Sequence, residues 1–158
     1  MPQPEIGRQA ESAEEYFELL HHVYDIRAAR RLIAADPGRP TQKLPVRETA
    51  RIYTLDRTRE ELREQHVIPL IGRPDEEYAL AHADLSVPVI IADVSNTFIG
   101  EGPEHTLVDG FHRLRRAFVE GVENLEAYVL NAQESWDIRV DSEKERRGER
   151  ELRTKRAQ

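Results

Sequence analysis

The chain has 158 residues, 39% hydrophobic and 34% charged, a composition typical of a globular protein with charged ends. It has no cysteine, which excludes disulfides, thiolate metal sites and a thiol nucleophile. The net charge of -7 is uneven: residues 141–158 hold seven Lys or Arg and five Asp or Glu, net +2, which leaves -9 on residues 1–140. Because non-specific nucleic-acid affinity comes mostly from Lys and Arg on phosphates, direct DNA binding by this acidic body is not expected.

The N-terminal region predicts a flexible lead-in followed by an added helix. Residues 1–10 hold two prolines, a glycine and no periodic pattern. Ser12 and Glu15 then have the spacing of a capping box, which predicts a helix over residues 12–35 that ends before Pro37. The apolar residues that recur at helical spacing are Tyr16, Leu19, Leu20, Val23, Ile26 and Ile33. We expect this face to pack on the core or to bind a second copy or a protein partner.

Neither a membrane span nor an export signal is expected. No apolar run approaches the roughly 20 residues that a membrane span needs. Residues 1–10 lack the basic start and the apolar centre of a secretion signal. The sequence therefore predicts a cytoplasmic protein without membrane contact.

The middle of the chain predicts alternating short elements. In chain order they are a loop over 39–45, an extended segment over 46–55, an exposed helix over 57–65, a buried strand over 66–71, a helix over 75–85, a strand over 87–94 and a loop over 95–104. A further strand is expected over 125–130, and residues 142–158 predict a solvated helix or a disordered tail. We therefore expect one domain over residues 11–140 and a charged tail over 141–158.

The most informative stretch runs from Leu107 to Phe118, where an apolar strand breaks at Asp109 and Gly110 and a helix follows at once. Glycine can turn there without a Cβ penalty, and the first amides of a helix have no partner within it, so the turn could hold a phosphate. His112 and Arg113 would place cationic groups at the positive end of the helix dipole. A bound phosphate would balance them, but a nearby carboxylate such as Asp109 would serve too. Asp109 could also be a simple helix cap.

This stretch also resembles a known family. A strand, Asp-Gly-x-His-Arg, and a helix with a small residue, Ala117, four positions past the Arg resemble the nucleotide-binding signature of the ParB N-terminal and sulfiredoxin superfamily. The resemblance extends more loosely over residues 46–130. It implies an α/β (α+β) fold with a small mixed sheet covered by helices. Members include partition proteins that bind and hydrolyse CTP, small kinases that phosphorylate free serine, and sulfiredoxins. The sulfiredoxin reaction is excluded, because Phe111 stands where those enzymes have their cysteine.

The resemblance also assigns roles to the residues of the turn. It implies that Gly110, Phe111, His112 and Arg113 bind the phosphates of a nucleotide such as ATP, ADP or CTP. His112 would balance charge on the phosphates and Arg113 would clamp them. Asp109 would orient a Mg²⁺ ion or accept a proton, with His112 as the second catalytic candidate. Asp93, at the end of the preceding strand, is another acidic candidate, although a loop-capping role suits it equally.

Two functions follow as hypotheses. The first is a ParB-like nucleotide-binding protein, which would be a Mg²⁺-dependent phosphotransferase or nucleotide hydrolase if it is catalytic. The second is a non-catalytic module with the same fold, which binds a protein partner or itself through the N-terminal helix or the charged tail. The histidines show no spacing typical of a zinc site.

Overall fold

The computed structural model describes residues 15–69, 74–95 and 102–157, and their contacts divide the chain into two compact units. One unit is Gly38–Asn131, and the other combines Met1–Pro37 with Ala132–Gln158. The two ends of the chain pair through the backbone: Asp25 N–H donates to Ile138 O, and Val140 N–H donates to Val23 O. This division differs from the expected single domain over residues 11–140.

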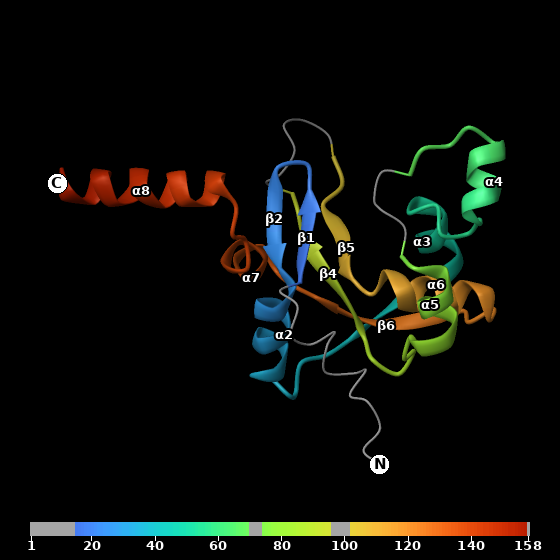
Figure 1. The fold of residues 1–158 in the computed structure, drawn as a ribbon. Coiled ribbons are helices and arrows are strands. Elements are labelled where there is room, and N and C mark those ends of the chain that lie inside the picture. The colour runs from blue at the N-terminus through green and yellow to red at the C-terminus, as the bar shows by residue number, and fades with distance from the viewer. Residues whose placement is uncertain (1–14, 70–73, 96–101, 158) are drawn as a thin grey trace, which may run out of the picture. The chain divides into compact units, whose positions relative to one another are not determined.

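The Gly38–Asn131 unit is built on a four-stranded mixed sheet (Figure 1). The strands, in spatial order, are β3 (Gln42–Pro45), β6 (Asn124–Val129), β4 (Val89–Asp93) and β5 (His105–Asp109). The central pair β4 and β6 is parallel, and the two outer pairs are antiparallel. The protein is thus a mixed α and β structure with a small mixed sheet, as the sequence predicts.

The described part of this unit also contains the helices α3 (Val46–Ile52), α4 (Arg59–Glu64), α5 (Glu76–His82) and α6 (Phe111–Val119). Local capping fixes two of their starts. Thr58 and Glu61 form a capping box at α4, and the Asp75 side chain accepts the Tyr78 N–H at α5. Helices α3 and α5 both pack against α6, and Figure 1 shows the three grouped beside the sheet.

The core of this unit lies between α3, α6 and the sheet. Its fully buried members include Leu114 and Ala117 on the inner face of α6, and the partly buried Phe111, Phe118 and Val122 pack against the cluster. The cluster comprises Val46, Ala50, Leu55, Val89, Leu107, Leu114, Ala117, Leu125 and Ala127. Burial of this many apolar side chains fixes α6 against β4 and β5, and it therefore fixes the turn that joins β5 to α6.

In its described residues, the unit formed by the chain ends contains a two-stranded hairpin and three helices. Its elements are β1 (Tyr16–Leu19), β2 (His22–Asp25), α2 (Ile26–Ala34), α7 (Ala132–Asp137) and α8 (Ser142–Arg156). The long helix α8 has no buried residue, so the C-terminal tail is a solvated helix rather than a disordered segment. No helix in the described part of the chain has both the length and the apolar character needed to cross a membrane.

The expected helix over residues 12–35 is wrong for most of its described length. Residues 16–25 form the hairpin, and only Ile26–Ala34 is helical. Phe17 and Tyr24 face each other across the hairpin and are buried, whereas Tyr16 and Leu20 of the supposed apolar stripe are 50% and 61% exposed. Ser12, the expected cap, lies outside the described residues. Asp25 caps α2 instead by accepting the Ala28 N–H.

Three other expectations differ from the structure. The loop over 39–45 contains strand β3, and the extended segment over 46–55 contains helix α3. The described part of the strand expected over 66–71 is irregular, and Ile68 is 88% exposed. Most of the loop expected over 95–104 lies outside the described residues. The structure confirms the remaining elements, which are the helices within 57–65 and 75–85, the strands within 87–94 and 125–130, and the strand and helix of the motif.

Candidate functional site

The turn between β5 and α6 has the geometry that the motif predicts. Gly110 is the N-cap residue of α6, with φ 118° and ψ 19° in the left-handed region. A Cβ at this position would lie 2.8 Å from the Cβ of Val89, a buried residue of β4. The carbonyl of Gly110 accepts the first helical hydrogen bond, from Leu114 N–H at 2.9 Å. Both the backbone angle and the contact with Val89 therefore require glycine.

The start of α6 lacks the side-chain cap that begins other helices of this chain. Thr58, Asp75 and Asp141 each accept a first-turn amide with a side-chain oxygen, but Gly110 has no side chain to do so. No acidic residue occupies the first turn of α6. The cap is Gly110, so the alternative in which Asp109 is the helix cap is wrong. The positive end of the α6 dipole receives no acceptor from its own cap residue.

Arg113 is directed toward protein acceptors. Its Nη1 donates to the carbonyls of Val87 and Pro88 at 2.9 and 2.6 Å, and its Nη2 donates to Asp109 Oδ2 at 3.0 Å. The Arg113 and Asp109 side chains are only 12% and 15% exposed. Of the two counter-ions that the sequence left open for Arg113, the structure contains the carboxylate of Asp109. Arg113 thereby ties α6 to the segment that enters β4.

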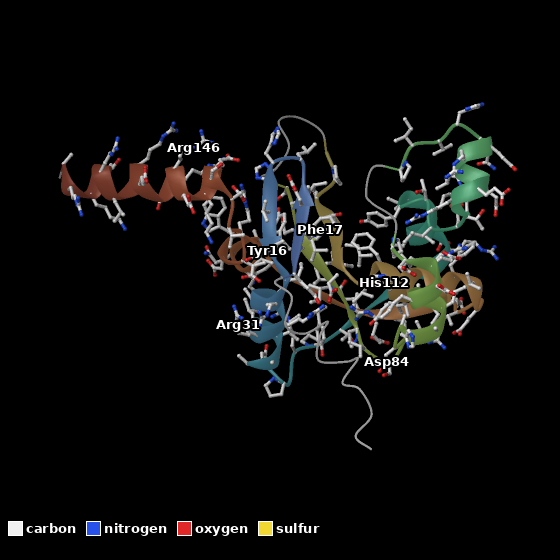
Figure 2. The ribbon with its side chains drawn as sticks, in the orientation of Figure 1. Tyr16, Phe17, Arg31, Asp84, His112 and Arg146 are labelled. Carbon is white, nitrogen blue, oxygen red and sulfur yellow. The ribbon has the colours of Figure 1, made fainter. Side chains whose placement is uncertain are left out.

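His112 and Phe111 point to different neighbours. The His112 ring lies edge-on to Tyr78 of α5, with the ring centroids 5.1 Å apart. Figure 2 labels His112 at the start of α6. The Phe111 ring packs edge-on against Tyr53 at 5.4 Å, and the Tyr53 hydroxyl accepts the Leu107 N–H of β5. Phe111 could therefore contribute only its backbone amide to a binding site. His112 is half-buried at the surface between α5 and α6.

The acidic candidates are far apart. In the antiparallel pair of β4 and β5, Asp109 pairs with Ile90, whereas Asp93 pairs with His105, four residues away. Four residues of a strand span about 13 Å. Asp93 accepts the N–H and hydroxyl of Ser95, and these hydrogen bonds lower its pKa. Asp93 is thus a loop cap. Mg²⁺ is commonly held by one or two carboxylates together with substrate phosphates, so Asp109 fits Mg²⁺ only with a bound nucleotide.

Among the described residues, the one group of three side chains that could share a metal ion lies elsewhere, and it is His22, Asp141 and Glu143. Arg139 already neutralises it, because Nε and Nη2 donate to the two oxygens of Asp141, each at 2.8 Å. The two oxygens also accept the backbone amides of Val23 and Lys144, so the carboxylate has no acceptor position left. This cluster is therefore an ionic anchor for the start of α8.

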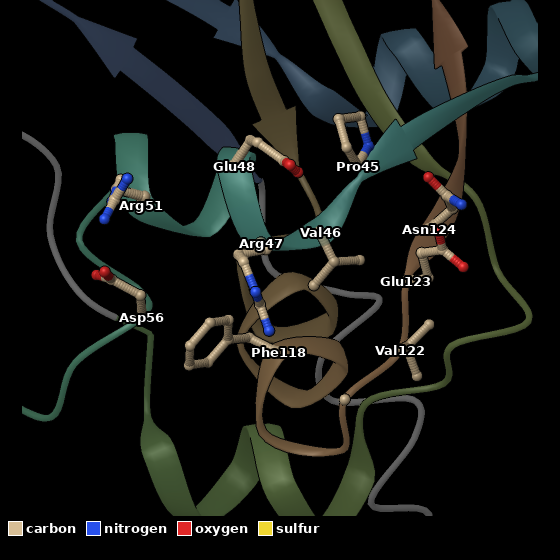
Figure 3. A pocket seen from close by; sticks show the side chains of 11 residues that line it. Pro45, Val46, Arg47, Glu48, Arg51, Asp56, Phe118, Val122, Glu123 and Asn124 are labelled. Carbon is tan, nitrogen blue, oxygen red and sulfur yellow. The ribbon is translucent and has the colours of Figure 1, made fainter.

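A groove at the opposite end of α6 was not predicted from the sequence (Figure 3). It has a volume of about 870 Å³ and is formed by α3 and by the segment from Phe118 to Asn124. None of Asp109, Gly110, Phe111, His112 and Arg113 lines it. The residues that do line it come from two segments about 70 positions apart along the chain, and no local sequence pattern connects the two.

Comparisons of the chain with protein-family models, with curated proteins and with solved structures find no match. A functional assignment therefore rests on the residues and geometry of the turn.

Proposed function

We propose that this protein is a ParB-like nucleotide-binding protein that holds the phosphates of a nucleotide at the turn between β5 and α6. The observation that carries the proposal is the start of α6, where a left-handed Gly110 turns β5 into the helix and brings no capping side chain of its own to the first helical amides. Such amides, at the positive end of a helix dipole, are a ready-made site for phosphate oxygens. The resemblance of Asp109–Arg113 to the family signature supports the same assignment.

The contacts of the turn suggest a role for each residue. The amides of Phe111, His112 and Arg113 bind phosphate oxygens, and the His112 imidazole approaches them from the side of α5. Arg113 keeps its three protein acceptors and holds the turn in shape, so it acts mainly as a positioning residue. Asp109 would hold Mg²⁺ jointly with the phosphates of the nucleotide. When bound, the ion neutralises charge on the phosphates.

If the protein is catalytic, the proposed reaction is phosphoryl transfer to an acceptor or hydrolysis of the nucleotide. Catalysis of this kind depends on positioning and charge stabilisation more than on covalent chemistry. The backbone amides and His112 stabilise negative charge on the transferred group. Asp109 would orient the ion, or accept the proton of the attacking acceptor hydroxyl or, in hydrolysis, of the attacking water.

Calorimetric titration of the full chain with ATP, ADP and CTP, with and without Mg²⁺, tests the proposal. We expect heat of binding with at least one nucleotide, and about a tenfold weaker affinity in His112→Ala, because a hydrogen bond to a charged group contributes roughly 1.5 kcal/mol or more. His82→Ala is the matched control: His82 also contacts Tyr78, at 5.2 Å, but belongs to α5 and not to the turn. Asp109→Asn should remove the effect of Mg²⁺. No heat with any of the three nucleotides would overturn the proposal.

The second candidate is a non-catalytic module with the same fold. The ion pair between Arg113 and Asp109 favours this candidate, because it balances the charge of Arg113 without a bound phosphate, as a turn with a purely structural role requires. The surface for self-association or a protein partner would then be the hairpin, where Tyr16 and Leu20 are exposed, rather than a long helix. Light scattering tests this. A mass above that of one chain, reduced in a Tyr16→Ser and Leu20→Ser double variant, would support the module, whereas a single-chain mass would exclude self-association.

A further inference from the structure

The groove at the end of α6 combines an apolar floor with a charged rim. Half-buried Phe118 and Val122 form the floor together with Pro45 and buried Val46. The rim side chains are Arg47, Glu48, Arg51, Asp56, Glu123 and Asn124. Figure 3 shows Arg47 above Phe118 in the middle of the groove, between Arg51 on one side and Glu123 on the other. A volume of about 870 Å³ falls within the range of small-molecule sites.

The two arginines are the distinctive feature of the rim. Arg47 and Arg51 lie four residues apart on α3, so they are neighbours on one helix face, where like charges repel each other. Neither side chain makes a hydrogen bond or ion pair with any residue that the structure describes. Arg113, Arg115 and Arg116 of α6, by contrast, all donate to acceptors of the protein. A pair of guanidinium groups that make no ion pair, set over an apolar floor, suits an anionic group with an apolar body.

The acidic residues of the rim limit the size and charge of that ligand. Asp56 is engaged by Arg57, with Nε to Oδ1 at 3.3 Å, so it does not neutralise Arg51. Glu48 and Glu123 lie on the rim as well and would repel additional negative groups. A polyphosphate or a nucleic-acid strand is therefore disfavoured. A ligand with one anionic group and an uncharged planar body satisfies both the arginines and the floor.

We infer that this groove binds a small amphipathic anion, whose single carboxylate or monophosphate contacts Arg47 and Arg51 while its aromatic or apolar body packs on Phe118 and Val122. The site is separate from the turn of the proposed nucleotide site, because the nine residues of α6 span about 13 Å between the two. A variant that abolishes binding at one of these sites therefore leaves binding at the other measurable.

The test uses the full chain, labelled with ¹⁵N, and three probes: phenyl phosphate, benzoate and inorganic phosphate. We expect phenyl phosphate or benzoate to shift the amide signals of residues 45–51 and 118–124, with an affinity at least ~10-fold above that of inorganic phosphate, since the ring adds apolar burial. A response to phenyl phosphate alone assigns a monophosphate ligand, and a response to benzoate alone assigns a carboxylate ligand. A response to both shows that the groove binds a ring with a negative charge and does not distinguish the two anionic groups.

The variants separate the groove from general charge attraction. Arg47→Gln and Arg51→Gln should each weaken binding about tenfold, as expected for loss of a charged hydrogen bond. Lys43→Gln on neighbouring β3 removes an exposed cation that does not line the groove, and it should leave binding unchanged. No shift with any probe, equal affinity for inorganic phosphate, or equal losses in all three variants would overturn the inference. Nucleotide binding at the turn is followed independently through His112→Ala.

Discussion

Replacing Gly110 with alanine tests the reasoning about the β5–α6 turn directly. The new Cβ would lie 2.8 Å from Val89 Cβ, closer than real Cβ contacts allow, and Val89 cannot move away because it is fully buried in the core. The φ of 118° is also one that side-chain-bearing residues rarely adopt. Gly110→Ala therefore combines a backbone penalty with overpacking.

The two penalties can be given magnitudes. A left-handed conformation costs an L-residue about 1–2 kcal/mol, and overpacking of a well-filled core costs about 1–3 kcal/mol. We expect the free energy of unfolding to fall by about 2–5 kcal/mol, a large share of the roughly 5–15 kcal/mol that stabilises a typical domain. Nucleotide binding at the turn should be lost in the same variant, because the first amides of α6 would shift with the displaced backbone.

Urea denaturation followed by circular dichroism measures the effect. Gly121→Ala is the matched control: Gly121 also has a positive φ, 72°, but its Cβ would meet no atom within 4 Å. In that variant only the backbone penalty applies, so the free energy of unfolding should fall by about 1–2 kcal/mol. Val89→Ala in the Gly110→Ala background should recover part of the loss, which a double-mutant cycle reports. Equal destabilisation by the two glycine variants would show that the contact with Val89 does not constrain the turn.

Three further predictions concern stability. Burial and Arg139 lower the pKa of His22 in the folded chain. The unfolded chain therefore binds a proton at His22 more readily than the folded chain does. Because protonation then favours the unfolded state, the urea midpoint should fall as the pH drops below about 6.5. In His22→Asn the midpoint should fall less over the same pH range. An identical pH profile in the two proteins would show that His22 does not cause the fall. Buried Arg115 donates to Glu76 and to the Leu55 carbonyl, so Arg115→Met should lower the free energy of unfolding by about 2–3 kcal/mol, against less for Glu76→Gln, since Glu76 is 41% exposed. Gly148→Ala, in the exposed α8, should raise helical ellipticity and stabilise α8 by about 1 kcal/mol, and unchanged ellipticity would refute this.

Several elements could be predicted because their signals lie within a few residues. Charges at helical spacing predict α4, and Val89, Ile90 and Ile91 in succession predict β4. The change from an apolar strand to a helix at Gly110 was predicted for the same reason: glycine is required where the backbone turns with a positive φ. The candidate turn was therefore found from the sequence.

Long-range packing decided the elements that were predicted wrongly. Tyr16, Leu20 and Val23 have helical spacing, but Phe17 and Tyr24 gain more burial as partners across a hairpin. The helix α3 follows Pro45, whose restricted φ suits the start of a helix as well as an extended segment, so the local sequence does not distinguish the two.

The sequence by itself determined where the candidate site lies: the glycine turn, the strand before it and the helix after it are all specified by adjacent residues. Only the tertiary structure decided what the side chains of the turn contact. The acceptors of Arg113 at Val87 and Pro88 come from 26 and 25 residues away, and the walls of the groove come from two segments about 70 residues apart. Local sequence fixes backbone conformation through steric and capping effects, whereas the partner of a long charged side chain depends on which distant segment the core brings within its reach.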